Sequence, residues 1–114
     1  MKVKVKDTEL ELFYTMRMFI IYENITNETV DFNKMGSTKQ LTTLLLACMM
    51  ASAQKKDIPF TMKYEEYMDW LDENGGYVLV GEFATWFANE LETRYSYIQE
   101  NDNKDNNKSK KAKG

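Results

Sequence analysis

The sequence predicts a mainly α fold: a compact bundle of about four helices, an N-terminal β-hairpin packed on that bundle, and a disordered C-terminal tail. Apolar residues recur at helical spacing through most of the chain, whereas strict alternation of apolar and polar residues is confined to residues 2–12. Residues 101–114 contain no apolar side chain larger than Ala112. We therefore expect one domain over residues 1–98 and a disordered basic tail over residues 99–114.

The N-terminal segment has the pattern of a hairpin. Residues 2–6 alternate lysine and valine, residues 9–12 alternate glutamate and leucine, and turn-forming residues lie between the two runs. Lysines of the first strand would meet glutamates of the second on one side. The other side would be apolar and would pack on the helices, because an isolated hairpin is only marginally stable in water. That side would consist of Val3, Val5, Leu10 and Leu12.

A first helix is predicted from about Met16 to Ile25, with Thr15 as its N-terminal cap. Apolar residues occupy almost every side of this segment. A helix without a polar face is expected to be central and buried. Residues 26–37, which are rich in threonine and asparagine, are predicted to form a loop.

A second helix is predicted to begin after a cap at Ser37 or Thr38 and to run to about Gln54. One stripe follows the i, i+3, i+4, i+7, i+8 spacing of a helix face. It consists of Leu41, Leu44, Leu45, Cys48 and Met49. The apolar neighbours of Cys48, the chain's one cysteine, indicate a buried small hydrophobic residue rather than a nucleophile.

A third helix is predicted to be capped by Thr61 and to end near Asn74. The pair Gly75-Gly76 follows, and glycine adopts the helix-ending conformation that other residues resist. The expected buried stripe, with Trp70 near its edge, consists of Tyr64, Tyr67, Met68 and Leu71.

A fourth helix is predicted from Val78 or Gly81 to about Ile98. Glu90 and Arg94 form an i, i+4 pair in the favourable order on this helix. The expected apolar face, widened by Trp86 and Tyr95, consists of Phe83, Phe87, Leu91 and Ile98.

Charge is unevenly placed along the chain. Residues 101–114 hold five lysines and two aspartates and so carry +3, which leaves −6 on residues 1–100 of a chain whose net charge is −3. An acidic body argues against a nucleic-acid groove, because phosphate contacts need clustered lysine and arginine. We interpret the tail as a solvated, solubilising segment; the alternative is contact with nucleic acid or an acidic protein.

The residues that usually carry catalysis are scarce. With no histidine and one cysteine, the chain has neither a Ser-His or Cys-His pair nor the ligands of a typical zinc site. Four carboxylates share one face of the third predicted helix, and we interpret them as a solvated acidic face rather than a metal or acid–base site. They are Glu65, Asp69, Asp72 and Glu73. We expect no enzymatic activity, no cofactor and no membrane-spanning segment.

The aromatic and methionine content is the remaining signal. Aromatic residues make up 13% of the chain, and it contains eight methionines. These side chains either fill the core or leave an exposed apolar groove that accepts a partner helix. Tryptophan and tyrosine are frequent interface anchors, and we expect Trp86 or Trp70 to be partly exposed. The candidate partner-binding residues are Trp70, Trp86, Phe87, Tyr95 and Tyr97.

Five short segments occur in an order that resembles the tail assembly chaperones of long-tailed bacteriophages and prophages. The segments are LEL (10–12), YTMR (14–17), IIYENIT (20–26), LTTLLLAC (41–48) and YEEYMDWLD (64–72). The resemblance covers residues 3–73, with a looser helical match to residue 98. One departure is Asn27, where such proteins often have glycine. The family has no compact site motif from which functional residues can be carried over.

The resemblance implies a non-enzymatic chaperone that binds the tape measure protein, a long helical chain, and keeps it soluble while tail tube subunits polymerise around it. It implies a location in the cytoplasm of a bacterial host and absence from the mature virion. In many such proteins a programmed frameshift near the end of the gene yields a longer product that recruits the tail tube protein. The segment Lys110-Lys111-Ala112-Lys113 can be encoded by an A-rich run, the kind of sequence on which ribosomes slip.

Two other functions stay open on the sequence. The acidic body is compatible with a small regulator or inhibitor from a phage or mobile element that binds a host protein through its acidic surface. A structural component of the virion is the second. A row of carboxylates would favour the regulator, an apolar groove would favour the chaperone, and presence in purified particles would favour the structural role.

Overall fold

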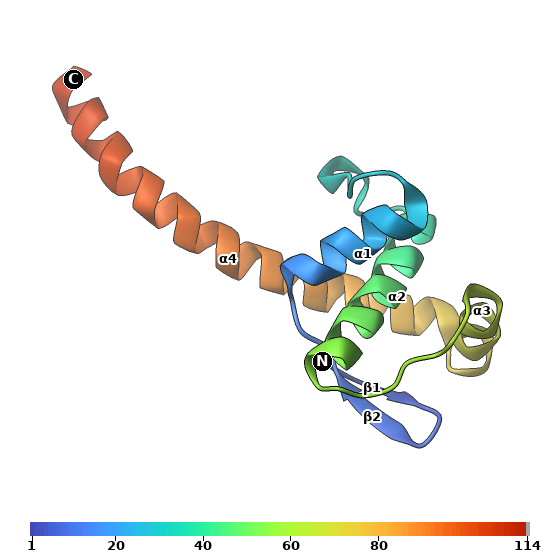
Figure 1. Ribbon diagram of the computed structural model, residues 1–114. Helices are drawn as coiled ribbons and strands as arrows, with labels where there is room; N and C mark the ends of the chain where they lie inside the picture. The colour runs from blue at the N-terminus through green and yellow to red at the C-terminus, as the bar shows by residue number, and fades with distance from the viewer. Residues whose placement is uncertain (114) are drawn as a thin grey trace.

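The computed structural model describes the backbone of residues 1–113 and the side chains of residues 1–95. Within those residues it confirms the predicted fold class: a two-stranded hairpin precedes four α-helices and a short 3-10 helix (Figure 1). The elements are β1 (Lys2–Val5), β2 (Thr8–Glu11), α1 (Met16–Thr26), η1 (Phe32–Lys34), α2 (Thr38–Lys55), α3 (Tyr64–Glu73) and α4 (Gly76–Lys113). The bounds of α4 extend past the predicted end at Ile98, into residues whose side chains lie outside the description, and the predicted disorder of residues 99–114 stays a prediction.

The hairpin has the predicted alternation. Strands β1 and β2 pair antiparallel, with Lys2 opposite Glu11 and Lys4 opposite Glu9. An ion pair joins Lys2 Nζ to Glu9 Oε1 at 3.3 Å. On the other face Val3, Leu10 and Leu12 are buried and Val5 is half-buried. This face packs on the helices, as the hairpin's marginal stability on its own requires.

Helix α2 is the centre of the core. Ser37 caps it by accepting a hydrogen bond from the Gln40 N–H at 3.3 Å. Helices α1 and α4 pack against it, and β2 also contacts it (Figure 1). The predicted stripe is buried, but so are the residues between its members, and every residue from 40 to 49 is buried. The sequence predicted burial on all sides for the first helix, but the structure shows it for α2.

The predicted burial of residues 16–25 is wrong. Thr15 caps α1 as expected, accepting a hydrogen bond from the Met18 N–H at 3.2 Å. Within α1, however, Met18 and Tyr22 are buried, whereas Met16 and Ile20 are 74% and 53% exposed. One face of α1 packs on α2, and its opposite apolar face is left open to solvent.

Asn27 ends α1 in the left-handed conformation, with φ +59°. Its backbone N–H donates to the Glu23 carbonyl at 2.7 Å, which closes the helix. Asparagine and glycine are the residues that most readily adopt this conformation at a helix end. The asparagine at this position therefore keeps the turn that a glycine would make.

The predicted cap of the third helix is wrong. Lys63, not Thr61, precedes α3, and it makes no side-chain cap bond. Glu65 and Glu66 in the first turn instead complement the positive end of the helix dipole. The buried face is also rotated relative to the prediction, because Trp70 lies in the core and Tyr64 is about half exposed. The buried residues of α3 are Tyr67, Trp70 and Leu71.

Gly75 makes the turn between α3 and α4, with φ +81°. Its carbonyl accepts hydrogen bonds from the N–H groups of Val78 at 2.8 Å and Leu79 at 3.3 Å. Because these bonds already belong to the first helical turn, α4 begins at Gly76, earlier than predicted. Of the predicted apolar face, Phe83 and Phe87 are fully buried and Leu91 is half-buried.

Candidate partner-binding groove

The structure does not bring together the four predicted partner-binding residues whose side chains it describes. Trp70 and Phe87 lie in the core, and Trp86 is half-buried with its ring 5.8 Å from that of Phe83. Tyr95 is 57% exposed. Tyr97 lies outside the residues whose side chains are described. The expectation of a partly exposed tryptophan is met by Trp86, but a shared surface for the five residues is not found among those described.

A different apolar surface is open to solvent, and Phe32 lies at its centre. Two adjoining hollows of about 500 Å³ and about 610 Å³ share Phe32 as a common wall. The first is lined by Tyr14, Met16, Phe19, Glu23, Thr29, Val30, Phe32 and Arg94. The second is lined by Phe32, Ala88, Leu91, Glu92 and Tyr95. We call the two hollows together the Phe32 groove; it lies between α1, η1 and α4.

The loop that carries Phe32 is held by Gln40. The Gln40 Oε1 accepts a hydrogen bond from the Asp31 N–H at 3.0 Å, and its Nε2 donates to the carbonyls of Asp31 at 2.9 Å and Lys34 at 3.2 Å. Asp31 in turn caps η1 by accepting a hydrogen bond from the Asn33 N–H at 2.9 Å. Phe32 stays half exposed at the tip of this ordered loop. A large aromatic residue is therefore held at the surface by a buried polar clamp.

The floor of the groove is continuous with the core through a chain of aromatic rings. The centroid of Phe32 lies 6.2 Å from that of Phe19, which lies 5.6 Å from Tyr14 in an edge-to-face arrangement. Tyr14 stacks on the buried Phe87 at 5.6 Å. Such contacts fix ring orientations. The groove is thus pre-formed rather than assembled from loose side chains.

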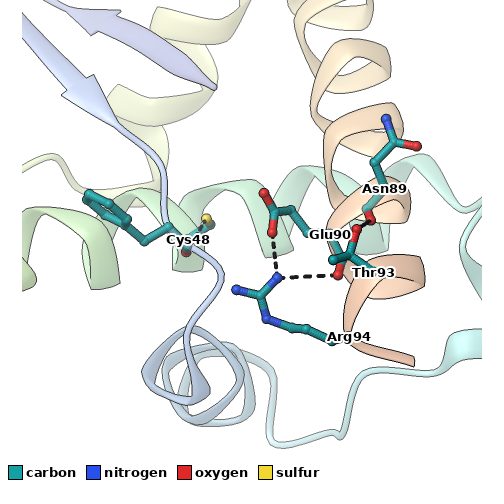
Figure 2. Close-up of polar contacts among 6 residues, drawn as sticks. Cys48, Asn89, Glu90, Thr93 and Arg94 are labelled. Carbon is teal, nitrogen blue, oxygen red and sulfur yellow. Dashed lines mark hydrogen bonds and ion pairs between the residues drawn. The ribbon is translucent and has the colours of Figure 1, made fainter. Parts of the chain in front are cut away.

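Arg94 closes one side of the groove. Its guanidinium lies 4.3 Å from the Tyr14 ring centroid, a cation–π contact, and it pairs with the Glu90 carboxylate one turn earlier (Figure 2). Burial raises the pKa of the Tyr14 hydroxyl, an effect that Arg94 partly opposes. Glu23 and Glu92 line the groove as well, and neither forms an ion pair with any residue whose side chain is described.

Cys48 has no role in this surface. It is fully buried, and its thiol donates a long hydrogen bond to the Phe13 carbonyl, 3.5 Å from sulfur to oxygen. Burial raises the pKa of the thiol to about 12, so it stays protonated at neutral pH. The sequence interpretation of Cys48 as a buried hydrophobic residue is confirmed.

Other kinds of site are not found in the described part of the chain. No group of three or more histidine, cysteine, aspartate or glutamate residues there is arranged to hold a metal ion. None of the described helices is both long and apolar enough to cross a membrane.

Sequence reasoning missed Phe32, Met16 and Leu91 as surface residues. Phe32 had a usable signal, because a lone large aromatic in a loop otherwise rich in polar residues has no helix face to join. Met16 had none, because α1 is apolar on most sides and its pattern does not say which side is covered.

Comparison with models of protein families, with curated proteins and with solved structures found no match to this chain.

Proposed function

We propose that this protein is a tail assembly chaperone that binds an apolar stripe of the tape measure protein and keeps that long helical chain soluble during tail tube assembly. The observation that carries the proposal is the Phe32 groove, an apolar surface that is open to solvent between α1, η1 and α4. An uncovered apolar stripe on an extended helix aggregates in water unless another protein covers it. Helix-in-groove binding is a common way to cover it.

Two features of the groove support a binding role over incidental exposure. Gln40, a buried polar residue, makes three hydrogen bonds with the backbone of the loop that presents Phe32. The aromatic contacts beneath Phe32 hold it in place. A pre-formed site loses less conformational entropy on binding than a flexible one. The order of this surface therefore favours recognition of a partner.

Co-expression with a tape measure protein tests the proposal. We expect the chaperone to increase the soluble fraction of that protein and to co-purify with it. The variant Phe32→Ser should lose both effects, since it removes the shared wall of the groove. Tyr77→Ser is the matched control, because Tyr77 is 80% exposed on α4 and does not line the groove. Failure of the wild-type chain to change the solubility of the tape measure protein would sink the proposal.

A second candidate function is supported by α3. Its carboxylates all lie on the exposed side of the helix, within about one third of its circumference at about 100° per residue. They are Glu65, Glu66, Asp69, Asp72 and Glu73. This row fits a regulator that binds a basic surface of a host protein. Reversing the charge of Glu65 and Asp69 would abolish that activity but leave tape measure binding intact.

A further inference from the structure

The unpaired charges that line the Phe32 groove are all negative, because its one described cation is already paired within the protein. Glu23 on α1 lines the first hollow and Glu92 on α4 lines the second, and both side chains are exposed. Among the described side chains that line the groove, Arg94 is the one cation, and it is already engaged by Glu90 and the Tyr14 ring. The rim therefore presents two carboxylates, from different helices, that have no cationic partner among the described side chains.

We infer that the groove binds an amphipathic helix whose apolar stripe is flanked by lysine or arginine residues. This inference rests on the proposed function, which requires a helical partner, and it adds the chemistry of that partner. A helix offers apolar side chains at i, i+3, i+4 and i+7 to a groove of this kind. Phe32 and Leu91 supply the apolar contacts, while Glu23 and Glu92 meet cations beside the stripe.

The chain's own C-terminal segment does not fit this site. Residues 101–114 are basic and would suit the rim, but they contain no apolar side chain larger than Ala112. Such a segment cannot fill hollows of about 500 Å³ and about 610 Å³ that are bordered by aromatic rings. An occupant must bring apolar bulk and positive charge together.

A second copy of the chain is disfavoured by charge. Residues 1–100 carry −6, so self-association through this face would bring two acidic bodies together. A symmetric contact places the same patch of both copies face to face, so Glu23 and Glu92 of one copy would lie close to those of the other. Like charges opposed in this way weaken association. A basic helical partner would instead attract Glu23 and Glu92, which strengthens association.

Two synthetic helical peptides test the inference against the full chain. Both carry the same apolar stripe and length, but one has lysine and the other glutamate at the flanking positions. We expect the lysine peptide to bind about threefold to thirtyfold more tightly by fluorescence anisotropy at about 50 mM salt, since two exposed ion pairs each add a modest factor. The difference should shrink at about 500 mM salt, where the Debye length is shorter.

The double variant Glu23→Gln/Glu92→Gln should remove the preference while keeping the apolar binding. The matched control Asp57→Asn/Glu82→Gln, at two exposed positions that do not line the groove, should leave the preference unchanged. Equal binding of both peptides, with loss of both in Phe32→Ser, would overturn the inference and leave the proposed function standing. Absence of binding by either peptide would count against both.

Discussion

Helices α1 and α2 are both rich in large apolar residues, yet the protein covers them differently. Every residue of α2 from 40 to 49 is buried, and Leu44 and Leu45 have no exposed surface. In α1, Met18 and Tyr22 are buried, while Met16 and Ile20 are more than half exposed. The uncovered side of α1 is continuous with the groove through Met16. Similar composition therefore stabilises the core in one helix and leaves an open apolar surface on the other.

The difference follows from the number of neighbours. Helix α2 contacts α1, α4 and β2, and polar groups of α2 find hydrogen-bond partners in α3 and in the segment that follows β2. The Thr42 carbonyl accepts a hydrogen bond from the Tyr67 hydroxyl at 2.6 Å, and Ser52 Oγ accepts one from the Phe13 N–H at 2.9 Å. Buried polar groups cost free energy unless they are paired in this way. Because its polar atoms are satisfied, α2 can be buried on every side.

Large-to-small substitutions should give the largest difference in unfolding free energy between variants of α2 and variants of α1. Leu45→Ala removes a fully buried side chain from α2 and should lower the free energy of unfolding by about 2–5 kcal/mol, because it leaves a cavity in the core. Ile20→Ala on the open side of α1 should change it by less than about 0.5 kcal/mol. Urea denaturation followed by circular dichroism measures both. Similar losses for the two variants would mean that the open face of α1 is covered in solution.

Alkaline pH should destabilise the protein through groups packed around α2. Burial raises the pKa of the Cys48 thiol from 9.0 to about 12, and burial likewise raises the pKa of Tyr67 above its ordinary value of 10.0. Above pH 9 the unfolded chain releases these protons while the folded chain keeps them. Because the folded state then binds more protons, the free energy of unfolding should fall with pH, by up to about 1.4 kcal/mol per pH unit for each group.

Urea unfolding between pH 8 and about 11 checks this slope. Cys48→Ala should remove the part that begins near pH 9, and Tyr67→Phe the part that begins near pH 10. Tyr22 on α1 acts in the same direction, because burial raises its pKa too. A slope that neither variant reduces would show that the burial of α2 is not its cause.

Gln40 links α2 to the groove, so its loss should affect both regions. Gln40→Ala leaves the Asp31 N–H and the carbonyls of Asp31 and Lys34 without their protein partner. We expect a loss of about 1–2 kcal/mol in unfolding free energy, because water replaces part of what is lost at a half-buried loop. The binding free energy of the peptide should fall by more than the free energy of unfolding does, because the loop no longer holds Phe32 in the groove. Gln54→Ala, at an exposed position of the same helix, is the control.

Local patterns in the sequence predicted much of the fold. Alternation placed the hairpin, and the β-branched and leucine side chains that it assigned to the inner face are buried or half-buried. Periodicity found the buried stripe of α2, and Gly75 marked the turn before α4. These features depend on residues within a few positions of one another, so one sequence contains the information.

The failures share a different physical origin. Which side of α1 is covered depends on how elements distant in sequence pack, and a helix that is apolar on most sides carries no pattern that decides it. The groove depends on a hydrogen-bonded clamp between Gln40 and a loop nine residues away, and on Leu91 of α4 lying beside Phe32. Neither contact leaves a periodic signal in the sequence. The prediction therefore relied on aromatic content and chose Trp70 and Phe87, which are buried in the core.

The N-terminal caps of α1 and α2 should show the smallest difference between the two helices. Thr15 caps α1 and Ser37 caps α2 with hydrogen bonds of similar length, 3.2 Å and 3.3 Å. Replacing either by alanine should lower the free energy of unfolding by about 1 kcal/mol. Thr61→Ala is the control and should change it by less than about 0.5 kcal/mol, because Thr61 is exposed and does not cap α3. A cap bond is formed within one turn, so its contribution should be the same for an exposed helix and a buried one. If Thr15→Ala cost far less than Ser37→Ala, α1 would be frayed at its start, and the wall that Met16 adds to the groove would be ordered only when a partner binds.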